Sequence, residues 1–285
     1  MPPDFLAIGH VTLDETENGL LPGGSCLYSA LLAHRLGLRV SVVTSLGPDF
    51  PREIIPSEIE LVSTPSRETT TFRHATKREG RALWLRHRAN EIGAEAVPAE
   101  WRSARIVYLC PVAGEVDPRL TANFSESSVG VGAQGWFRSS GPEIVPIPWR
   151  SAAFVLPHTQ ALFLSQEDVA GLESNEILEH FERVPVGALT LAHEGALLFV
   201  NGERYRVPPV PMASVEPTGA GDVFAAAFLI HYDREGDPWL AAGYAACAGA
   251  LAVTDQGLAG VPTREALEIL WSAYLRQQDR RGAIS

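Results

Sequence analysis

A glycine pair and an aspartate stand directly before a run of helix-forming residues. Residues 215–224 read Val-Glu-Pro-Thr-Gly-Ala-Gly-Asp-Val-Phe, and the run Val-Phe-Ala-Ala-Ala-Phe-Leu-Ile after Asp222 contains no helix breaker. Proline is tolerated just before a helix, and Gly219 and Gly221 let the backbone approach a ligand closely. The first N–H groups of this helix have no partner inside it and would point into the turn, where they can hold an anion.

A carboxylate at such a helix start would repel a bound phosphate. Asp222 makes chemical sense there if it takes a proton from a hydroxyl group while the amides hold the developing negative charge. The helix dipole predicts a low pKa for this aspartate. An ordinary glycine-rich loop, with an aspartate favoured by the same dipole, accounts for the local spacing equally well.

The segment Thr218-Gly219-Ala220-Gly221-Asp222, followed by Val-Phe, resembles the signature of the ribokinase-like (PfkB) carbohydrate kinases. In that family the Gly-Ala-Gly backbone forms an anion hole for the transferred phosphate, and the aspartate is the catalytic base. The resemblance implies these roles for Gly219, Ala220, Gly221 and Asp222, and places Thr218 beside the nucleotide. It also implies ATP as phosphate donor and Mg²⁺ bridging the phosphates. A loose phosphoryl transition state tolerates a base of low pKa because the proton can leave late.

The N-terminal region also resembles the family, whose members carry an early aspartate and a Gly-Gly pair that bind the sugar hydroxyls. Here the corresponding residues are Asp14, Gly23 and Gly24. A carboxylate can accept two hydroxyl hydrogen bonds, and glycines let a substrate lie against the backbone. Many members have asparagine where this chain has Tyr28, a departure that favours the polyol branch resembling myo-inositol kinases. Packing of Tyr28 into the core is the alternative.

The segment around Gly135 contains Gly130-x-Gly132-x-x-Gly135, the dinucleotide-binding spacing. We reject that interpretation because Trp136-Phe137-Arg138 does not begin a helix and no acidic residue follows at about 20 positions. The same segment resembles one in the polyol-kinase branch that faces the cleft. Arg138 is therefore a candidate to steady substrate or phosphate, with a surface salt bridge as the alternative.

Two further segments resemble the donor side of the family. Where the family has Asn-x-x-Glu, which organises magnesium and phosphate through water, this chain has Ser165 and Asp168. A plain helix cap with acids in the first turn explains that pair nearly as well. Where the family has Thr-x-Gly-x-x-Gly at the nucleotide phosphates, Thr190 and Gly195 match, and Ala192 replaces the middle glycine.

Composition excludes several classes of function. The 285 residues carry a formal net charge of -11, which argues against a nucleic-acid partner. Lys77 is the only lysine, and its neighbours Thr76 and Arg78 do not form a Walker A loop. The three cysteines have neither metal nor redox spacing, which is typical of reduced, buried thiols in a cytoplasmic protein. The apolar run 239–253 is shorter than the ~20 residues of a membrane span.

The order of the elements predicts one α/β domain over residues 1–285, a ribokinase-like three-layer α/β/α fold with a mostly parallel central sheet. A small β lid is expected from two insertions, at about 12–21 and 59–92, the second containing a hairpin with a polar connection at 73–81. Asn201-Gly202 predicts a further hairpin. Residues 277–285 read as a frayed tail.

These observations predict an ATP-dependent kinase that phosphorylates a hydroxyl of a small sugar or cyclitol. A nucleoside kinase of the same family and a non-catalytic sugar or nucleotide sensor are the alternatives. The expected protein is cytoplasmic, binds neither nucleic acid nor membrane, and forms a homodimer through the lid, whose exposed strand edges can pair.

Overall fold

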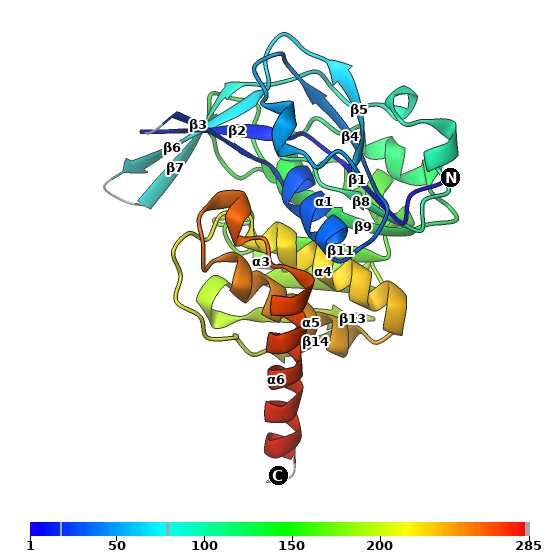
Figure 1. The fold of residues 1–285 in the computed structure, drawn as a ribbon, viewed down its shortest axis with the longest axis vertical. Helices are drawn as coiled ribbons and strands as arrows, with labels where there is room; N and C mark the ends of the chain where they lie inside the picture. The colour runs from blue at the N-terminus through cyan, green and yellow to red at the C-terminus, as the bar shows by residue number, and fades with distance from the viewer. Residues whose placement is uncertain (18, 78–79, 283–285) are drawn as a thin grey trace.

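A mostly parallel sheet forms the centre of the protein (Figure 1). The computed structural model describes residues 1–282 apart from residues 18, 78 and 79. Within that part the strand order is β14-β13-β12-β11-β9-β8-β1-β4-β5, with only β13 and β14 antiparallel to their neighbours. The bounds are β1 (Phe5–Ile8), β4 (Val40–Leu46), β5 (Glu60–Pro65), β8 (Ile106–Leu109), β9 (Ser128–Gly132), β11 (Ala161–Ser165), β12 (Val186–Thr190), β13 (Ala196–Val200) and β14 (Glu203–Val207).

Helices cover both faces of this sheet because alternate strand residues are buried on opposite sides. In β1, Phe5 and Ala7 join one core with the longer helices, whereas Leu6 and Ile8 join the other. The first core contains α1 (Ser25–Arg35), α4 (Ala220–Glu235), α5 (Pro238–Ala252) and the start of α6 (Arg264–Gly282). The second core contains α2 (Ala152–Val155) and α3 (Ser174–Glu182). This arrangement confirms the predicted three-layer α/β/α class.

Short 3-10 helices complete the connections. Their bounds are η1 (Arg52–Ile54), η2 (Ala94–Ala96), η3 (Ala99–Trp101), η4 (Pro118–Asn123), η5 (Ala133–Phe137), η6 (Leu156–His158), η7 (Ala192–Glu194) and η8 (Gly257–Gly260).

A second, smaller sheet projects from one edge of the body as a lid (Figure 1). Its order is β10-β7-β6-β2-β3, with β2 (Thr12–Thr16), β3 (Gly19–Gly23), β6 (Thr70–Lys77), β7 (Gly80–His87) and β10 (Glu143–Ile144). The expected lid insertion at 59–92 is therefore only partly correct. Its first strand, β5, pairs with β4 in the central sheet, and only the later strands β6 and β7 belong to the lid. Residues 73–77, predicted as a polar connection, continue β6, because alternating polar residues suit a solvated strand face.

Glycines end or turn several elements as predicted. Gly37, with φ +80°, follows the end of α1, where a left-handed residue stops a helix. Asn201 and Gly202 both have positive φ (49° and 83°), as a type I′ hairpin between β13 and β14 requires. The predicted frayed tail is wrong through Gly282, because α6 continues to that residue and extends away from the body (Figure 1). None of the described helices has the length and apolarity to cross a bilayer.

Candidate active site

The Gly-Ala-Gly turn begins α4 as predicted. Gly219 is its N-cap in the left-handed region, with φ 81°. A Cβ there would lie 2.4 Å from Cε1 of Tyr28, so only glycine fits. The N–H of Ala220 donates to the carbonyl oxygen of Pro217 at 3.2 Å. The N–H groups of Gly221 and Asp222 have no acceptor within the described part of the chain, so they remain available for an anion.

Asp222, in the first turn of α4, accepts a hydrogen bond from a residue of another helix. The hydroxyl of Ser25, the first residue of α1, donates a hydrogen bond to Oδ1 of Asp222. Burial raises the pKa of Asp222 to about 6; the Ser25 hydrogen bond lowers it, the charge of Asp168 raises it, and Arg138 lowers it. The prediction of a low pKa is therefore wrong, because loss of water around the carboxylate outweighs the helix dipole.

Asp14 lies on the inner face of the lid, beside the start of α1. A Cβ on Gly23 would lie 3.0 Å from Oδ2 of Asp14 and 3.8 Å from Cε2 of Tyr28. Since Tyr28 also contacts the Gly219 position, one aromatic ring joins the aspartate of the lid to the turn before α4. Tyr28 is 3% exposed, so it is both a core residue and a wall of this corner. His74 Nε2 lies 3.8 Å from Oδ1 of Asp14.

The inner face of the lid is mainly apolar around Asp14. Phe72 pairs with Asp14 across β2 and β6, and Leu85 pairs with Phe72 across β6 and β7. Leu83 pairs with His74 two residues further along. Residues directly paired in register share a sheet face, so an acceptor bound at Asp14 would meet one carboxylate, one imidazole and an apolar roof.

Arg138 connects the lid to the donor side. Its guanidinium donates to the carbonyl oxygen of Val112 and to Oε1 of Gln134, both at 2.8 Å. It also lies 5.7 Å from the ring centroid of Phe72 and 4.0 Å from Oδ1 of Asp168. The surface salt bridge considered for Arg138 does not fit, because its side chain is 18% exposed and fixed within the site.

The donor-side candidates lie at the carboxyl ends of neighbouring strands, where α/β proteins bind ligands. Ser165 ends β11 and pairs in register with Thr190, which ends β12. Oδ2 of Asp168 accepts hydrogen bonds from the backbone N–H (2.9 Å) and the hydroxyl (2.7 Å) of Ser165. This is a turn after a strand; the helix-cap alternative is wrong, since α3 begins at Ser174.

The connection after β12 needs backbone conformations that glycine favours. Ala192 has φ 51°, in the left-handed region, although it is not glycine. Gly195 has φ 92°, and a Cβ on it would lie 2.2 Å from the carbonyl oxygen of Val207, so this turn is packed against the end of β14. Contact of Gly195 and Thr218 with a nucleotide stays a prediction.

The described residues contain no group of three or more His, Cys, Asp or Glu side chains placed to hold a metal ion. All three cysteines, Cys26, Cys110 and Cys247, are free and buried, as predicted.

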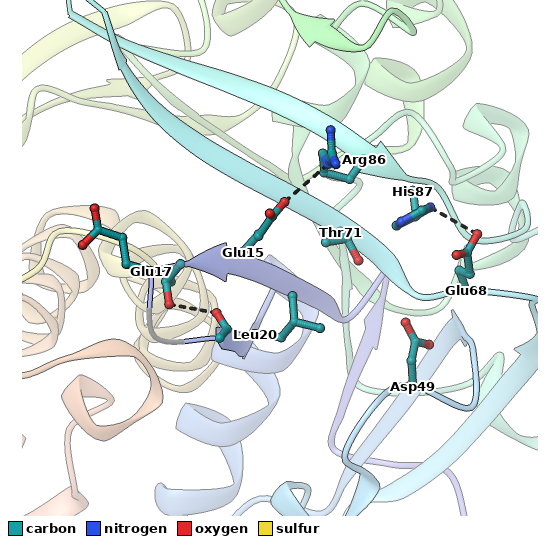
Figure 2. A pocket seen from close by; sticks show the side chains of 10 residues that line it. Glu15, Glu17, Leu20, Asp49, Glu68, Thr71, Arg86 and His87 are labelled. Carbon is teal, nitrogen blue, oxygen red and sulfur yellow. Dashed lines mark hydrogen bonds and ion pairs between the residues drawn. The ribbon is translucent and has the colours of Figure 1, made fainter.

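A pocket of about 540 Å³ lies on the other face of the lid (Figure 2). Glu15 alternates with Asp14 along β2 and so points away from the corner at Asp222. In this pocket Arg86 lies 3.4 Å from Glu15, and His87 lies 3.1 Å from Glu68. With Glu17 and Asp49 also present, four carboxylates line it, which does not suit a phosphate donor.

Sequence reasoning missed several residues of the corner. Ser25 directly follows the Gly-Gly pair, which was a usable signal for a hydroxyl at the site. Phe72 and His74 were assigned to a lid hairpin without a role, because a strand pattern does not reveal which face meets another element. Tyr108, whose hydroxyl would contact a Cβ on Gly132, lies in a strand that reads as ordinary core.

Comparison with known proteins agrees with this fold. Residues 155–264 match the model of the pfkB family carbohydrate kinases. A cytidine kinase of Thermococcus kodakarensis is 23% identical over 252 residues, covering 81% of this chain and 89% of that protein. A pyrophosphate-dependent myo-inositol-1 kinase variant converted into a myo-inositol-3 kinase superposes with TM-score 0.78 at 20% identity, over 95% of this chain and 99% of that one. Arabidopsis thaliana ribokinase, complexed with ribose and ATP, superposes with TM-score 0.73 at 19% identity, over 95% and 99%.

The fold and the matched segment define a ribokinase-like α/β kinase. The matched segment contains the Gly-Ala-Gly turn and Asp222, and the matched family and relatives support a phosphotransferase with an alcohol group as acceptor.

Proposed function

We propose that this protein transfers the γ-phosphate of ATP to a hydroxyl group of a small sugar or cyclitol. The observation that carries the proposal is the shared corner: Tyr28 contacts both the Gly219 position and the Gly23 position beside Asp14. The candidate base Asp222 and the candidate acceptor-binding residue Asp14 therefore lie on either side of one aromatic ring. An acceptor held by Asp14, Gly23 and Gly24 would present a hydroxyl toward Asp222.

In the proposed reaction, Asp222 orients the attacking hydroxyl and takes its proton as the bond to phosphorus forms. The backbone at Gly219–Gly221 and the start of α4 would hold the charge on the transferred group. Arg138 would add a fixed positive charge between the lid and the donor side. Thr190, Gly195, Ser165 and Thr218 are the proposed donor-binding residues.

A magnesium ion fits this site if the phosphates supply most of its ligands. Mg²⁺ usually binds through one or two carboxylates, waters and substrate phosphates. Asp168 would contribute through water, because both its oxygens already face protein groups. When bound, the ion would neutralise charge on the phosphates. ATP and the free buried cysteines both suit a reducing cytoplasm.

A nucleoside acceptor is the second candidate, favoured by the inner face of the lid. Phe72, Leu83 and Leu85 offer apolar surface to a planar base, while Asp14 would bind sugar hydroxyls. The cytidine kinase relative supports the same choice. The sensor alternative is set aside, since the matched family and relatives are kinases.

A screen of sugars, cyclitols and nucleosides with ATP and Mg²⁺, read as ADP release, tests the proposal. Asp222→Asn should lower turnover on the best acceptor roughly 10²- to 10⁴-fold, with nearly unchanged ATP affinity. Asp117→Asn makes the same charge change at an exposed ion pair on the entry to η4 and should leave turnover intact. Wild-type turnover by Asp222→Asn would refute the assignment of the base.

We also propose a homodimer formed through the lid. Leu20 and Leu21 are 51% and 38% exposed on β3, the edge strand of the lid sheet. An edge strand presents unpaired backbone groups that a second sheet can complete.

A further inference from the structure

The first turn of α1 reaches across to the first turn of α4. Ser25 follows Gly24, whose φ is 95° and where a Cβ would lie 2.6 Å from the carbonyl oxygen of His10. Gly24 therefore seats the start of α1 directly against the connection between β1 and β2. Ser25 is 1% exposed, and its hydroxyl donates to Oδ1 of Asp222. The Ser25 hydroxyl is therefore fixed in place, with Asp222 accepting its hydrogen bond and the Tyr108 hydroxyl as a second hydrogen-bond neighbour.

We propose that Ser25 is a positioning residue for the catalytic aspartate. By donating to Oδ1, it fixes the carboxylate of Asp222 so that Oδ2 is the oxygen that receives the acceptor proton. The inference rests on the proposed function of Asp222. It is chemically consistent with the transfer itself, because Oδ1 keeps accepting from Ser25 while Oδ2 becomes protonated.

The other residues around Asp222 do not fix the orientation of its carboxylate by a side-chain hydrogen bond. The charged groups facing the carboxylate are Asp168 and Arg138, which act on its pKa through space. Tyr28 from α1 and Tyr108 and Cys110 from the β8 side also face it; burial first, and the charge of Asp222 after it, raise the pKa of each of these groups. Among the described residues, Ser25 is the group whose side chain hydrogen-bonds Asp222.

Ser25→Ala tests the inference, and Ser29→Ala is its matched control. Ser29 is one turn along α1 and fully buried, but its hydroxyl donates to the backbone carbonyl oxygens of Ser25 and Cys26 and not to the carboxylate of Asp222. Ser25→Ala should lower kcat roughly 10- to 100-fold, as expected for the loss of one hydrogen bond to a charged group. The KM for the acceptor should change little. Ser25→Thr, which retains a hydroxyl, should recover part of the loss.

The pH dependence separates positioning from packing. Removing a donor to the ionised carboxylate raises its pKa, so the acid limb of kcat/KM should move to higher pH in Ser25→Ala and stay in place in Ser29→Ala. Equal profiles and equal rates in the two variants would overturn the proposal, as would a Ser25→Ala effect confined to KM.

A carboxyl titration by ¹³C NMR gives a readout independent of turnover. Aspartate-labelled protein shows the Asp222 signal as the one missing in Asp222→Asn. Its midpoint should move to higher pH in Ser25→Ala, and an unmoved midpoint counts against the inference. If Asp222→Asn keeps wild-type turnover, the base assignment fails; if it loses turnover while Ser25→Ala behaves as wild type, only the role of Ser25 fails.

Discussion

At the scale of single residues, the proton affinity of Asp222 sets the working pH. Burial raises its pKa to about 6, and only the ionised carboxylate can take a proton from the acceptor. We therefore expect kcat/KM to be level above about pH 7 and to fall as the pH drops through the pKa of Asp222, about 6. A pH–rate profile measured at subsaturating acceptor checks this. An acid limb centred near the ordinary aspartate pKa of about 4 would contradict it.

The same raised pKa predicts that the carboxylate of Asp222, the proposed base, destabilises the fold. The pKa of Asp222 in the folded protein lies above the ordinary aspartate value of 3.8, so the unfolded chain favours the ionised form and the fold loses stability at neutral pH. Asp222→Asn should raise the free energy of unfolding by roughly 1–3 kcal/mol at pH 8. The gain should shrink toward zero below pH 4, where both states are protonated. Urea unfolding at the two pH values measures it, and a pH-independent difference would refute the linkage.

Ala192 predicts a second stability effect at this scale. Its φ of 51° is unfavourable for a residue with a Cβ, and its side chain is exposed. Ala192→Gly should therefore stabilise the protein by about 1 kcal/mol. Ala213→Gly, at an exposed alanine without positive φ, should be neutral or slightly destabilising. The urea unfolding midpoints of both variants, compared with that of the wild type, test this prediction. A lower midpoint for Ala192→Gly would contradict it.

At the scale of elements, the lid is joined to the body around His10. Nε2 of His10 faces the carbonyl oxygen of Asn90 at 2.9 Å and so carries the proton; Nδ1 then accepts from the hydroxyl of Thr70 at 2.6 Å. The same hydroxyl accepts from the N–H of Ala89 at 2.9 Å. These residues lie where the chain passes between the two sheets: His10 between β1 and β2, Thr70 at the start of β6, and Asn90 after β7. One buried imidazole therefore links three crossings between the sheets.

We expect Thr70→Val to loosen this junction while preserving side-chain shape. Because Asp14 enters the site from the lid, the KM for the acceptor should rise several-fold, as expected when a lid hinge is altered, with little effect on ATP. Thr71→Val, whose hydroxyl bonds only the nearby carbonyl oxygen of Thr69, is the control. Steady-state kinetics of both variants is the measurement, and equal acceptor KM values would exclude the hinge role.

Element types were largely predictable, whereas element ends depended on tertiary contacts. Asn201-Gly202 was predicted as a hairpin turn and connects β13 to β14. The serine and acids at 165–168 fit a helix start by local rules, yet the chain makes a turn there because Ser165 ends a strand of the sheet. Both arrangements satisfy the same side-chain-to-backbone hydrogen bond, so local chemistry could not separate them.

At the scale of the whole molecule, the sequence indicated which residues could react but not how they meet. Asp14, Tyr28 and Asp222 were all candidates from their motifs. Their meeting at one corner depends on how α1 and α4 pack together and on the fold of the lid. Ser25 became visible only there, because its role is defined by a contact 197 positions away in the chain.

The proposed lid dimer makes a prediction at this largest scale. Sedimentation should give twice the 30.8 kDa chain mass, and a Leu20→Arg, Leu21→Glu double variant should sediment as a monomer, because charge on the edge strand β3 opposes sheet pairing. Ile269→Arg, at a residue 64% exposed on α6, adds charge far from the lid strands and should leave the mass unchanged. If the lid variant stays dimeric while Ile269→Arg dissociates, the interface lies at the helical end, and the pocket beside β3 faces solvent.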